Sequence, residues 1–185
     1  MHPYCEYVSN IEDENDVDKI YHDLHYGVPI YDDNELFCRL VMEINQAGLS
    51  WHTILVKEKN FRNAYHNFDI KKVAKYGEKD FARLMNDPGI IRNRLKINAA
   101  IYNAQKIQDI QKEFGGFRKW LDIQDRRLKD LETKDKDALK KEWVKLFKKN
   151  FKFVGGEIVG EFLMSIDMLP GAHDKSCKAI SVKSN

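Results

Sequence analysis

Four side chains of the kinds that bind metal ions lie in two groups near the opposite ends of this 185-residue sequence. Cys5 and His22 form the first group, and His173 and Cys177, spaced as His-x-x-x-Cys, form the second. Two thiolates and two neutral imidazoles make a complete ligand set for tetrahedral zinc. A shared metal would tie the two chain ends together. The spacing alone leaves two alternatives open, an oxidised Cys5–Cys177 pair and unrelated surface histidines with terminal cysteines.

The number of cysteines favours reduced thiols. Three cysteines are an odd number, which does not suit a disulfide framework. Cys38 lies within the apolar segment 36–40, and we expect it to be a small core residue. Cys5 and Cys177 therefore remain as the pair that needs an explanation.

The sequence carries no membrane or export signal that we can identify. No apolar stretch approaches the length that crosses a membrane. The segment Met1-His2-Pro3-Tyr4-Cys5 lacks the basic and apolar regions of a signal peptide. We therefore expect a cytoplasmic protein with no membrane partner.

The charges are divided unevenly along the chain, although the formal net charge is only +2. Residues 1–35 contain ten acidic residues and one basic residue, Lys19, whereas the remainder carries 30 basic against 19 acidic residues. A basic body of this kind can follow a phosphate backbone while the acidic leader stays away from it. Solvated lysines on helix faces are the simpler explanation on charge alone.

Nearly every periodic segment of the sequence has the spacing of an amphipathic helix. The clearest example begins at Asp33-Asn34, which can cap a helix that runs to Ala47 and ends before Gly48. We expect further helices over residues 78–86, 92–114, 117–123, 136–150 and 157–168. No alternating strand pattern, internal repeat or low-complexity tract is present. The sequence therefore predicts an all-α fold in a single domain, residues 1–185, with two helical lobes.

Glu43 lies beside the apolar stripe of the first of these helices, because it follows Leu40 by three residues. A carboxylate in such a place is costly unless a partner compensates it. A local ion pair, or a position at the edge of the stripe, would account for it equally well.

The segment after Glu43, residues 45–51, combines several groups that suit ring recognition. It supplies amides, a flexible turn at Gly48, an apolar wedge in Leu49 and an aromatic plate in Trp51. This combination is typical of a pocket that stacks a planar ring. A core tryptophan near a helix end is the simpler interpretation of these residues alone.

Two further segments combine basic residues with turns. Residues 84–96 form a short helix, a turn at Asp87-Pro88-Gly89, and a helix that begins with Arg92, Arg94 and Lys96. Backbone N–H groups at a helix start, with bases nearby, can hold a phosphate, although an ordinary turn with exposed bases is simpler. Residues 150–156 follow a lysine-rich helix and suit either a nucleic-acid backbone or simple packing of their phenylalanines.

Six blocks of the sequence occur together in a fixed order. The most specific are Gln-Ala-Gly-Leu-Ser-Trp at 46–51, preceded by Glu43, and Gly-Ile-Ile-Arg-Asn-Arg-Leu-Lys at 89–96. The others are Cys5-Glu6-Tyr7, the block at 21–29, the block at 151–155 and His173 with Cys177. In this order they resemble the bacterial DNA-3-methyladenine glycosylase I family over about residues 5–177.

The resemblance implies a helix-hairpin-helix DNA glycosylase fold. It implies a hairpin at about residues 81–97 and one structural zinc ion that joins residues 5–22 to residues 173–177. The implied zinc ligands are Cys5, His22, His173 and Cys177. Since protein side chains fill all four positions, this zinc would not activate water.

The resemblance also implies roles for residues around a base pocket. Glu43 would bind the Hoogsteen edge of an extruded base, with Tyr21 and Trp51 as stacking walls. Tyr7 and Tyr26 would border the same pocket. The implied DNA contacts are Leu49, which would fill the gap in the duplex, and, along the phosphate backbone, Gly89, Arg92, Arg94 and Lys96.

The implied activity is hydrolysis of the N-glycosidic bond of 3-methyladenine in alkylated double-stranded DNA. We assign catalysis to Glu43, because a carboxylate complements a cationic base through a charge-assisted hydrogen bond. No lysine nucleophile for Schiff-base chemistry is identified, so we expect a monofunctional enzyme without strand cleavage. We also expect a monomer that uses no nucleotide cofactor.

The sequence departs from the family pattern around the pocket. Tyr7 and Tyr26 stand where tryptophans are usual, and Asp18 stands where a pocket tyrosine is common. Residues 162–165 read Phe-Leu-Met-Ser where Phe-Met-Gln-Ala is usual. Two alternatives follow, a glycosylase for another alkylated base and a non-catalytic DNA-binding member. Glu43 and Trp51 argue against the second, because DNA binding alone does not require a carboxylate that reads a base edge.

Overall fold

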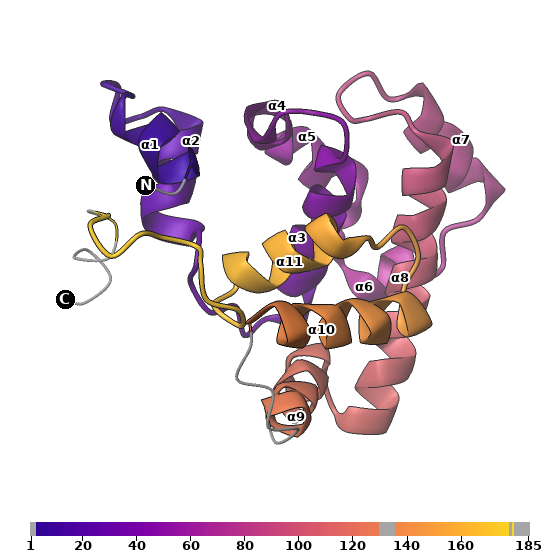
Figure 1. Ribbon diagram of the computed structural model, residues 1–185. Helices are drawn as coiled ribbons and strands as arrows, with labels where there is room; N and C mark the ends of the chain where they lie inside the picture. The colour runs from indigo at the N-terminus through magenta and orange to yellow at the C-terminus, as the bar shows by residue number, and fades with distance from the viewer. Residues whose placement is uncertain (1–2, 130–135, 178, 180–185) are drawn as a thin grey trace.

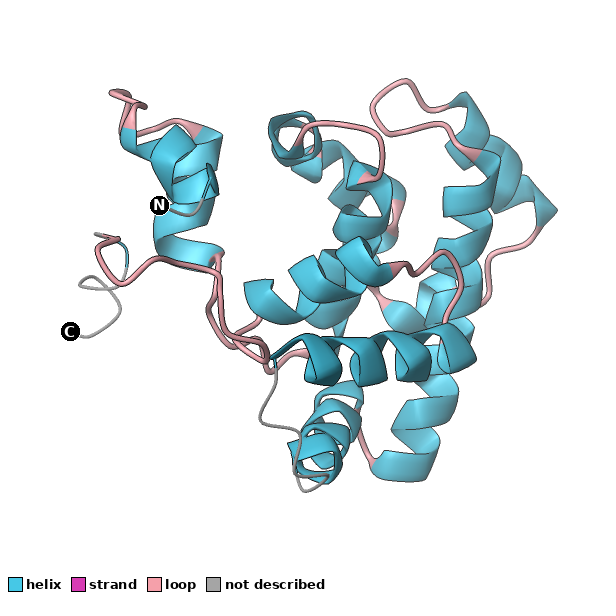
Figure 2. Cartoon of the chain, viewed as in Figure 1, coloured by secondary structure: helices cyan, strands magenta, loops and turns pink. Residues whose placement is uncertain are grey.

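The chain folds into helices in the computed structural model, which describes residues 3–129, 136–177 and 179. No strand occurs among these residues, which confirms the predicted all-α class for them (Figure 2). None of their helices has both the length and the apolar character needed to span a membrane. The helices are α1 (Pro3–Ser9), α2 (Val17–Ile20), the π-helix η1 (Tyr21–His25), α3 (Asp33–Gln46), α4 (Trp51–Val56), α5 (Glu58–Ala64), the 3-10 helix η2 (His66–Phe68), α6 (Ile70–Val73), α7 (Glu78–Asn86), α8 (Arg94–Phe114), α9 (Phe117–Lys129), α10 (Lys136–Asn150) and α11 (Gly156–Ser165).

Polar caps set the helix starts that differ from the predicted ones. The side chain of Asp32 accepts a hydrogen bond from the main-chain nitrogen of Glu35, so Asp32 caps α3 in place of Asp33-Asn34. Asn93 caps α8 in the same way, and this helix therefore begins at Arg94 instead of residue 92. At the other ends, α9 continues to residue 129 and α11 stops at residue 165.

Helix α3 supplies the centre of the core. α4, α8, α9 and α11 all pack against it. Cys38 is 2% exposed, as predicted for a small core residue. Burial of a large apolar side chain such as leucine or phenylalanine contributes about 1.5–3 kcal/mol. The predicted apolar face is confirmed by five residues of α3 with no exposed surface, Leu36, Phe37, Leu40, Val41 and Ile44.

The segment 150–156 belongs to the same core. Phe151 is buried, and its ring packs against those of Phe117, Trp120 and Phe147. The main-chain nitrogen of the following residue donates a hydrogen bond to the side-chain oxygen of Asn103 at 2.8 Å. The structure therefore favours the packing explanation for Phe151.

The two ends of the described chain meet on one side of the bundle, beside η1 (Figure 1). Gly27 makes this close approach feasible, because its φ is +65° and a Cβ there would lie 2.8 Å from that of Ala172. The nitrogen of Gly27 donates to the main-chain oxygen of Ser165 at 2.9 Å. As a result, α1, α2 and η1 face α3, α4 and α11 across a cavity.

Candidate functional site

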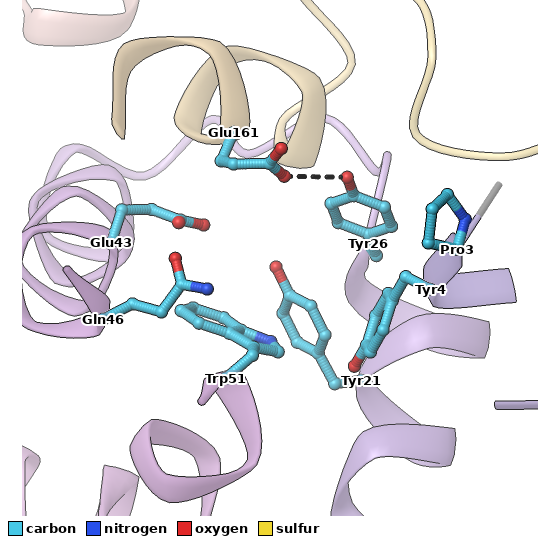
Figure 3. A pocket seen from close by; sticks show the side chains of 8 residues that line it. All are labelled: Pro3, Tyr4, Tyr21, Tyr26, Glu43, Gln46, Trp51 and Glu161. Carbon is cyan, nitrogen blue, oxygen red and sulfur yellow. Dashed lines mark hydrogen bonds between the residues drawn. The ribbon is translucent and has the colours of Figure 1, made fainter. Parts of the chain in front are cut away.

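A cavity of about 320 Å³ lies between the N-terminal helices and the bundle (Figure 3). Aromatic side chains and two carboxylates form most of its wall, and among the residues that the structure describes none that lines it is basic. Its lining consists of Pro3, Tyr4, Tyr21, Tyr26, Glu43, Gln46, Trp51 and Glu161. Four of the five predicted base-binding residues are therefore brought together here, from three different helices and the turn after η1.

The side chain of Glu43 projects from α3 toward this cavity, although Glu43 is only 3% exposed (Figure 3). Among the described residues, no hydrogen-bond donor faces its carboxylate, so the local ion pair considered from sequence is absent. The pKa of Glu43 is raised to about 8, chiefly by burial, while Arg39 opposes the change and the nearby carboxylate of Glu161 adds to it. A buried carboxylate that lacks a protein partner and faces a cavity is suited to a ligand that supplies donors or positive charge.

The aromatic walls of the cavity come from Tyr21, Tyr26 and Trp51. The centroid of the Tyr21 ring lies 5.1 Å from that of Trp51 and 5.8 Å from that of Tyr26. Arg39 fixes the ring of Tyr21, because Nη1 of Arg39 donates a hydrogen bond to the phenol oxygen at 2.8 Å. Rings held in this way can stack on a planar base.

Tyr4 lines the cavity where the sequence predicted Tyr7. Both residues lie on α1, three positions apart, so they share one side of the helix. Tyr7 is 50% exposed and stacks on the outer face of Tyr4 with 6.3 Å between the ring centroids. Assigning Tyr7 to the pocket was therefore wrong. The tilt of α1 decides which tyrosine reaches the cavity, and this tilt is a tertiary property.

Asp18 holds the side chain of Tyr4 through a hydrogen bond. Its carboxylate is 1% exposed and accepts a hydrogen bond from the Tyr4 phenol at 3.1 Å. The other carboxylate oxygen contacts Nδ1 of His52, which follows Trp51 at the start of α4. The acidic residue that replaces the usual tyrosine therefore joins α1 and α2 to α4.

Glu161 is a site residue that the sequence did not predict. It projects from α11 into the cavity, and its Oε2 accepts a hydrogen bond from the phenol of Tyr26 at 3.1 Å (Figure 3). The signal was the same as for Glu43, a carboxylate within an apolar helical run, here next to the buried Phe162.

The predicted DNA-contact residues mostly lie on exposed turns. Leu49 is 40% exposed in the turn between α3 and α4. Gly89 lies in the turn between α7 and α8, where a Cβ would come within 3.1 Å of Asn60. Arg92 and Arg94 are exposed, and neither forms an ion pair within the described part of the chain. These positions are accessible to a large ligand.

Lys96 differs from the other predicted contacts because it is buried. Only 4% of the residue is exposed, and its ammonium group donates to the main-chain oxygens of Asn45 at 2.8 Å and Ala47 at 2.7 Å. Burial lowers the pKa of Lys96. The prediction that Lys96 binds phosphate is therefore wrong, because the helical turn directs its side chain inward to the end of α3.

The four predicted metal ligands lie together beside η1, with their donor atoms within 4.8 Å of one another. Sγ of Cys5 lies 3.4 Å from Nε2 of His22 and 3.8 Å from Nδ1 of His173. Sγ of Cys177 lies 3.6 Å and 3.5 Å from the same two nitrogens. Both thiols are free, so the oxidised pair considered from sequence is absent from the structure.

The geometry of this cluster fits a tetrahedral metal ion. Zn–S bonds of about 2.3 Å and Zn–N bonds of about 2.0–2.1 Å place sulfur and nitrogen ligands about 3.5 Å apart. The remaining ring nitrogens also have partners, because Nδ1 of His22 lies 2.7 Å from Asp23 and Nε2 of His173 donates to the Tyr26 carbonyl. Such contacts orient histidine ligands.

Comparison with known proteins extends these observations. The family model described as methyladenine glycosylase matches residues 11–180. The DNA-3-methyladenine glycosylase of Haemophilus influenzae is 33% identical over 170 residues, covering 85% of this chain and 90% of that protein. DNA-3-methyladenine glycosylase 1 of Escherichia coli K12 is 38% identical over 160 residues, covering 80% and 84%.

A solved structure shows that the likeness includes the fold. The 3-methyladenine DNA glycosylase I of Staphylococcus aureus, solved to explain its recognition of 3-methyladenine, superimposes with a TM-score of 0.78 at 32% identity. The match covers 96% of each chain. The resemblance inferred from the six sequence blocks is therefore confirmed. This chain belongs to the methyladenine glycosylase family.

Proposed function

We propose that this protein hydrolyses the N-glycosidic bond of 3-methyladenine in alkylated double-stranded DNA. The observation that carries the proposal is the unpartnered carboxylate of Glu43 in an aromatic cavity large enough for a planar base. The related proteins are named for action on the same base.

The lesion itself provides much of the driving force. Methylation at N3 gives the adenine ring a positive charge, so the base is a good leaving group and its bond to C1′ is weak. The damaged base also stacks and pairs less well, which lowers the cost of extruding it. Tyr21, Tyr26 and Trp51 would stack on the extruded ring while Glu43 accepts a hydrogen bond from its edge.

In this reaction the C1′–N9 bond breaks with its electron pair going to the base, which leaves as neutral 3-methyladenine. Water then adds to C1′ of the oxocarbenium-like sugar and releases a proton to the solvent. Glu43 stabilises the cationic base through charge. In the empty cavity its pKa of about 8 keeps much of it protonated near neutral pH, and a bound cation favours the ionised form. Because no lysine lines the cavity among the described residues, we propose hydrolysis without a Schiff base and without strand cleavage.

DNA would approach along the exposed turns next to the cavity. We propose that Leu49 fills the space left by the extruded base, and that the turn at Gly89 with Arg92 and Arg94 contacts phosphates. Lys96 has no part in this surface, since its ammonium group is buried.

We further propose that Cys5, His22, His173 and Cys177 hold one structural zinc ion. The donor set and the sulfur–nitrogen distances of 3.4–3.8 Å support this assignment. The ion would cross-link the two chain ends. Because His173 bonds to the main chain of Tyr26, the cross-link would also hold one wall of the cavity in place.

A second candidate function is release of a different alkylated base. Glu161 favours it, because a second carboxylate beside Glu43 changes the charge of the cavity. A purely DNA-binding role is less consistent with the site, since such a role gives no reason to bury an unpartnered carboxylate.

The test is release of bases from methylated duplex DNA by the wild type, Glu43→Gln and the control Glu113→Gln, whose side chain is exposed on α8. We expect the wild type and the control to release 3-methyladenine at equal rates. Glu43→Gln should be at least about 100-fold slower while still binding DNA. Intact DNA binding by a wild type that releases no base would overturn the proposal, and release of only another methylated base would favour the second candidate.

A further inference from the structure

Two carboxylates face the same cavity from different helices. Glu43 reaches it from α3 and Glu161 from α11, and Figure 3 shows both side chains directed toward the space above Tyr21. The pKa of Glu43 is raised in part by the charge of Glu161, so the two groups interact electrostatically. The site therefore contains more negative charge than one edge-reading glutamate would supply.

The position of Glu161 is fixed by Tyr26. The Tyr26 phenol donates to Oε2 of Glu161 at 3.1 Å, and Tyr26 itself is only 3% exposed. His173 holds the main chain of Tyr26 through a 2.9 Å hydrogen bond to its carbonyl oxygen. Within the described residues, the second oxygen of Glu161 has no hydrogen-bond partner, so it remains available to a ligand.

Within the described ranges 3–129, 136–177 and 179, no basic residue of the lining neutralises this pair. Arg39 is a positive charge that lowers the pKa of Glu43, and its guanidinium donates to the phenol of Tyr21. In the empty cavity, burial and the repulsion from Glu161 keep much of Glu43 protonated. A cation placed beside both carboxylates favours the ionised pair and is attracted by both charges. A neutral base of the same shape receives no such benefit, so the cavity favours positive charge over shape alone.

We propose that Glu161 is a specificity-determining residue that contacts the positively charged ring of an N-alkylated purine held between it and Glu43. The proposal rests on the proposed glycosylase function and extends it to the substrate class. The second carboxylate selects cationic alkylated purines and discriminates against neutral lesions of similar size, such as hypoxanthine. Glu43 recognises the edge of the base, and Glu161 adds recognition of its charge.

Binding of small probes tests the proposal separately from turnover. The 3,9-dimethyladeninium ion, which is cationic at neutral pH, and the neutral 9-methyladenine share the purine ring and differ by the N3-methyl group and the positive charge that it brings. Their affinities can be measured by quenching of the intrinsic fluorescence, because Trp51 and Tyr21 line the cavity. We expect the wild type to bind the cation at least about tenfold more tightly than the neutral base.

Three variants separate charge from structure. Glu161→Gln keeps the size of the side chain and should lose about tenfold in affinity for the cation, with no change for the neutral base. Glu161→Asp keeps the charge and should retain the preference. Glu157→Gln is the matched control, because its side chain is 92% exposed on the same helix, and it should bind both probes as the wild type does.

The outcomes are distinct for the two proposals. Equal losses for both probes in Glu161→Gln, or no loss for either, would overturn the role of Glu161, as would a wild type that does not prefer the cation. Should Glu161→Gln fold poorly, loss of the preference in Glu161→Asp would likewise contradict it. A selective loss in Glu161→Gln supports the role even when the wild type releases no base from DNA, a result that overturns only the proposed function.

Discussion

The ammonium nitrogen of Lys96 lies 2.7 Å from the main-chain oxygen of Ala47, so the first turn of α8 holds the end of α3. A second hydrogen bond from Lys96 reaches the main-chain oxygen of Asn45 at 2.8 Å. Carbonyl groups at the end of a helix lack partners within the helix and carry partial negative charge, which a buried cation satisfies. This clamp positions the turn that carries Leu49 and leads into Trp51.

Lys96→Met should therefore lower the free energy of unfolding by about 2–4 kcal/mol, because it leaves two carbonyl groups without their charged donor. Chemical denaturation of the variant measures this loss. The matched control is Arg94→Met, two residues earlier and exposed, which should change the free energy of unfolding by less than about 0.5 kcal/mol. Equal effects of the two substitutions would contradict the clamp.

DNA binding should depend on Arg92 and Arg94 through charge. Each phosphate contact that is removed lowers the slope of log K against log salt by about 1. We expect Arg92→Ala and Arg94→Ala each to reduce this slope in titrations of a duplex with an abasic site. Lys96→Met should leave this slope unchanged, because Lys96 is only 4% exposed and its ammonium group donates to main-chain oxygens. A lower slope for Lys96→Met would show that this side chain leaves its buried position.

Asp18 should stabilise the wall formed by Tyr4 and α4. Asp18→Ala removes a buried acceptor from the Tyr4 phenol and from His52, and we expect a loss of about 2–3 kcal/mol in the free energy of unfolding. His52→Ala should cost less than about 1 kcal/mol, because the side chain of His52 is 49% exposed. Glu12→Ala, exposed in the same acidic segment, serves as the control. A larger loss in His52→Ala than in Asp18→Ala would argue against this order of contributions.

Glu43 should make the stability of the protein decrease with rising pH. Its pKa is about 8 in the folded protein against an ordinary value of 4.5, so the folded state retains a proton that the unfolded state releases. The resulting penalty is absent below pH 4.5, grows between pH 4.5 and 8, and is complete above pH 8. Each pKa unit corresponds to about 1.4 kcal/mol.

The variant Glu43→Gln carries no titrating group at this position and should avoid the penalty. We expect it to match the wild type in free energy of unfolding near pH 4 and to exceed it by a few kcal/mol near pH 8. Denaturation curves across this pH range measure the difference. A constant difference at every pH would contradict burial of a titrating carboxylate. The same variant should lose activity, which is the usual compromise between stability and function at an active site.

Metal content provides a further prediction. Elemental analysis of the purified protein should find close to one zinc ion per chain, and Cys177→Ser should lose most of it. Removing the ion should lower the midpoint of thermal unfolding by roughly 10 °C, because each kcal/mol shifts the midpoint of a chain of this size by about 2–4 °C. Cys38→Ala, at a buried cysteine far from the cluster in sequence, should keep its zinc. A metal-free native protein of full stability would contradict the proposed cross-link.

Local rules predicted the longer helices, α3 and α7 to α11, because periodicity and capping depend on neighbouring residues. The apolar stripe of α3, and the place of Glu43 beside it, follow from spacing alone, whereas the structure decided that Glu43 is buried. The four Cys and His residues were identified by their chemistry. These are properties that a sequence carries before it folds.

The tertiary structure decided which face of each helix meets the cavity. Tyr4 replaces Tyr7 because of how α1 is tilted, and Lys96 turns inward because the end of α3 offers two carbonyl groups. Glu161 became a site residue only because α11 packs against α3 on the same side of the cavity, which brings together two carboxylates that are 118 positions apart in the chain. The sequence by itself thus determined the helices and the chemical inventory of this protein. Contacts between distant segments determined the charge and shape of the pocket, since no local preference encodes which side chains meet there.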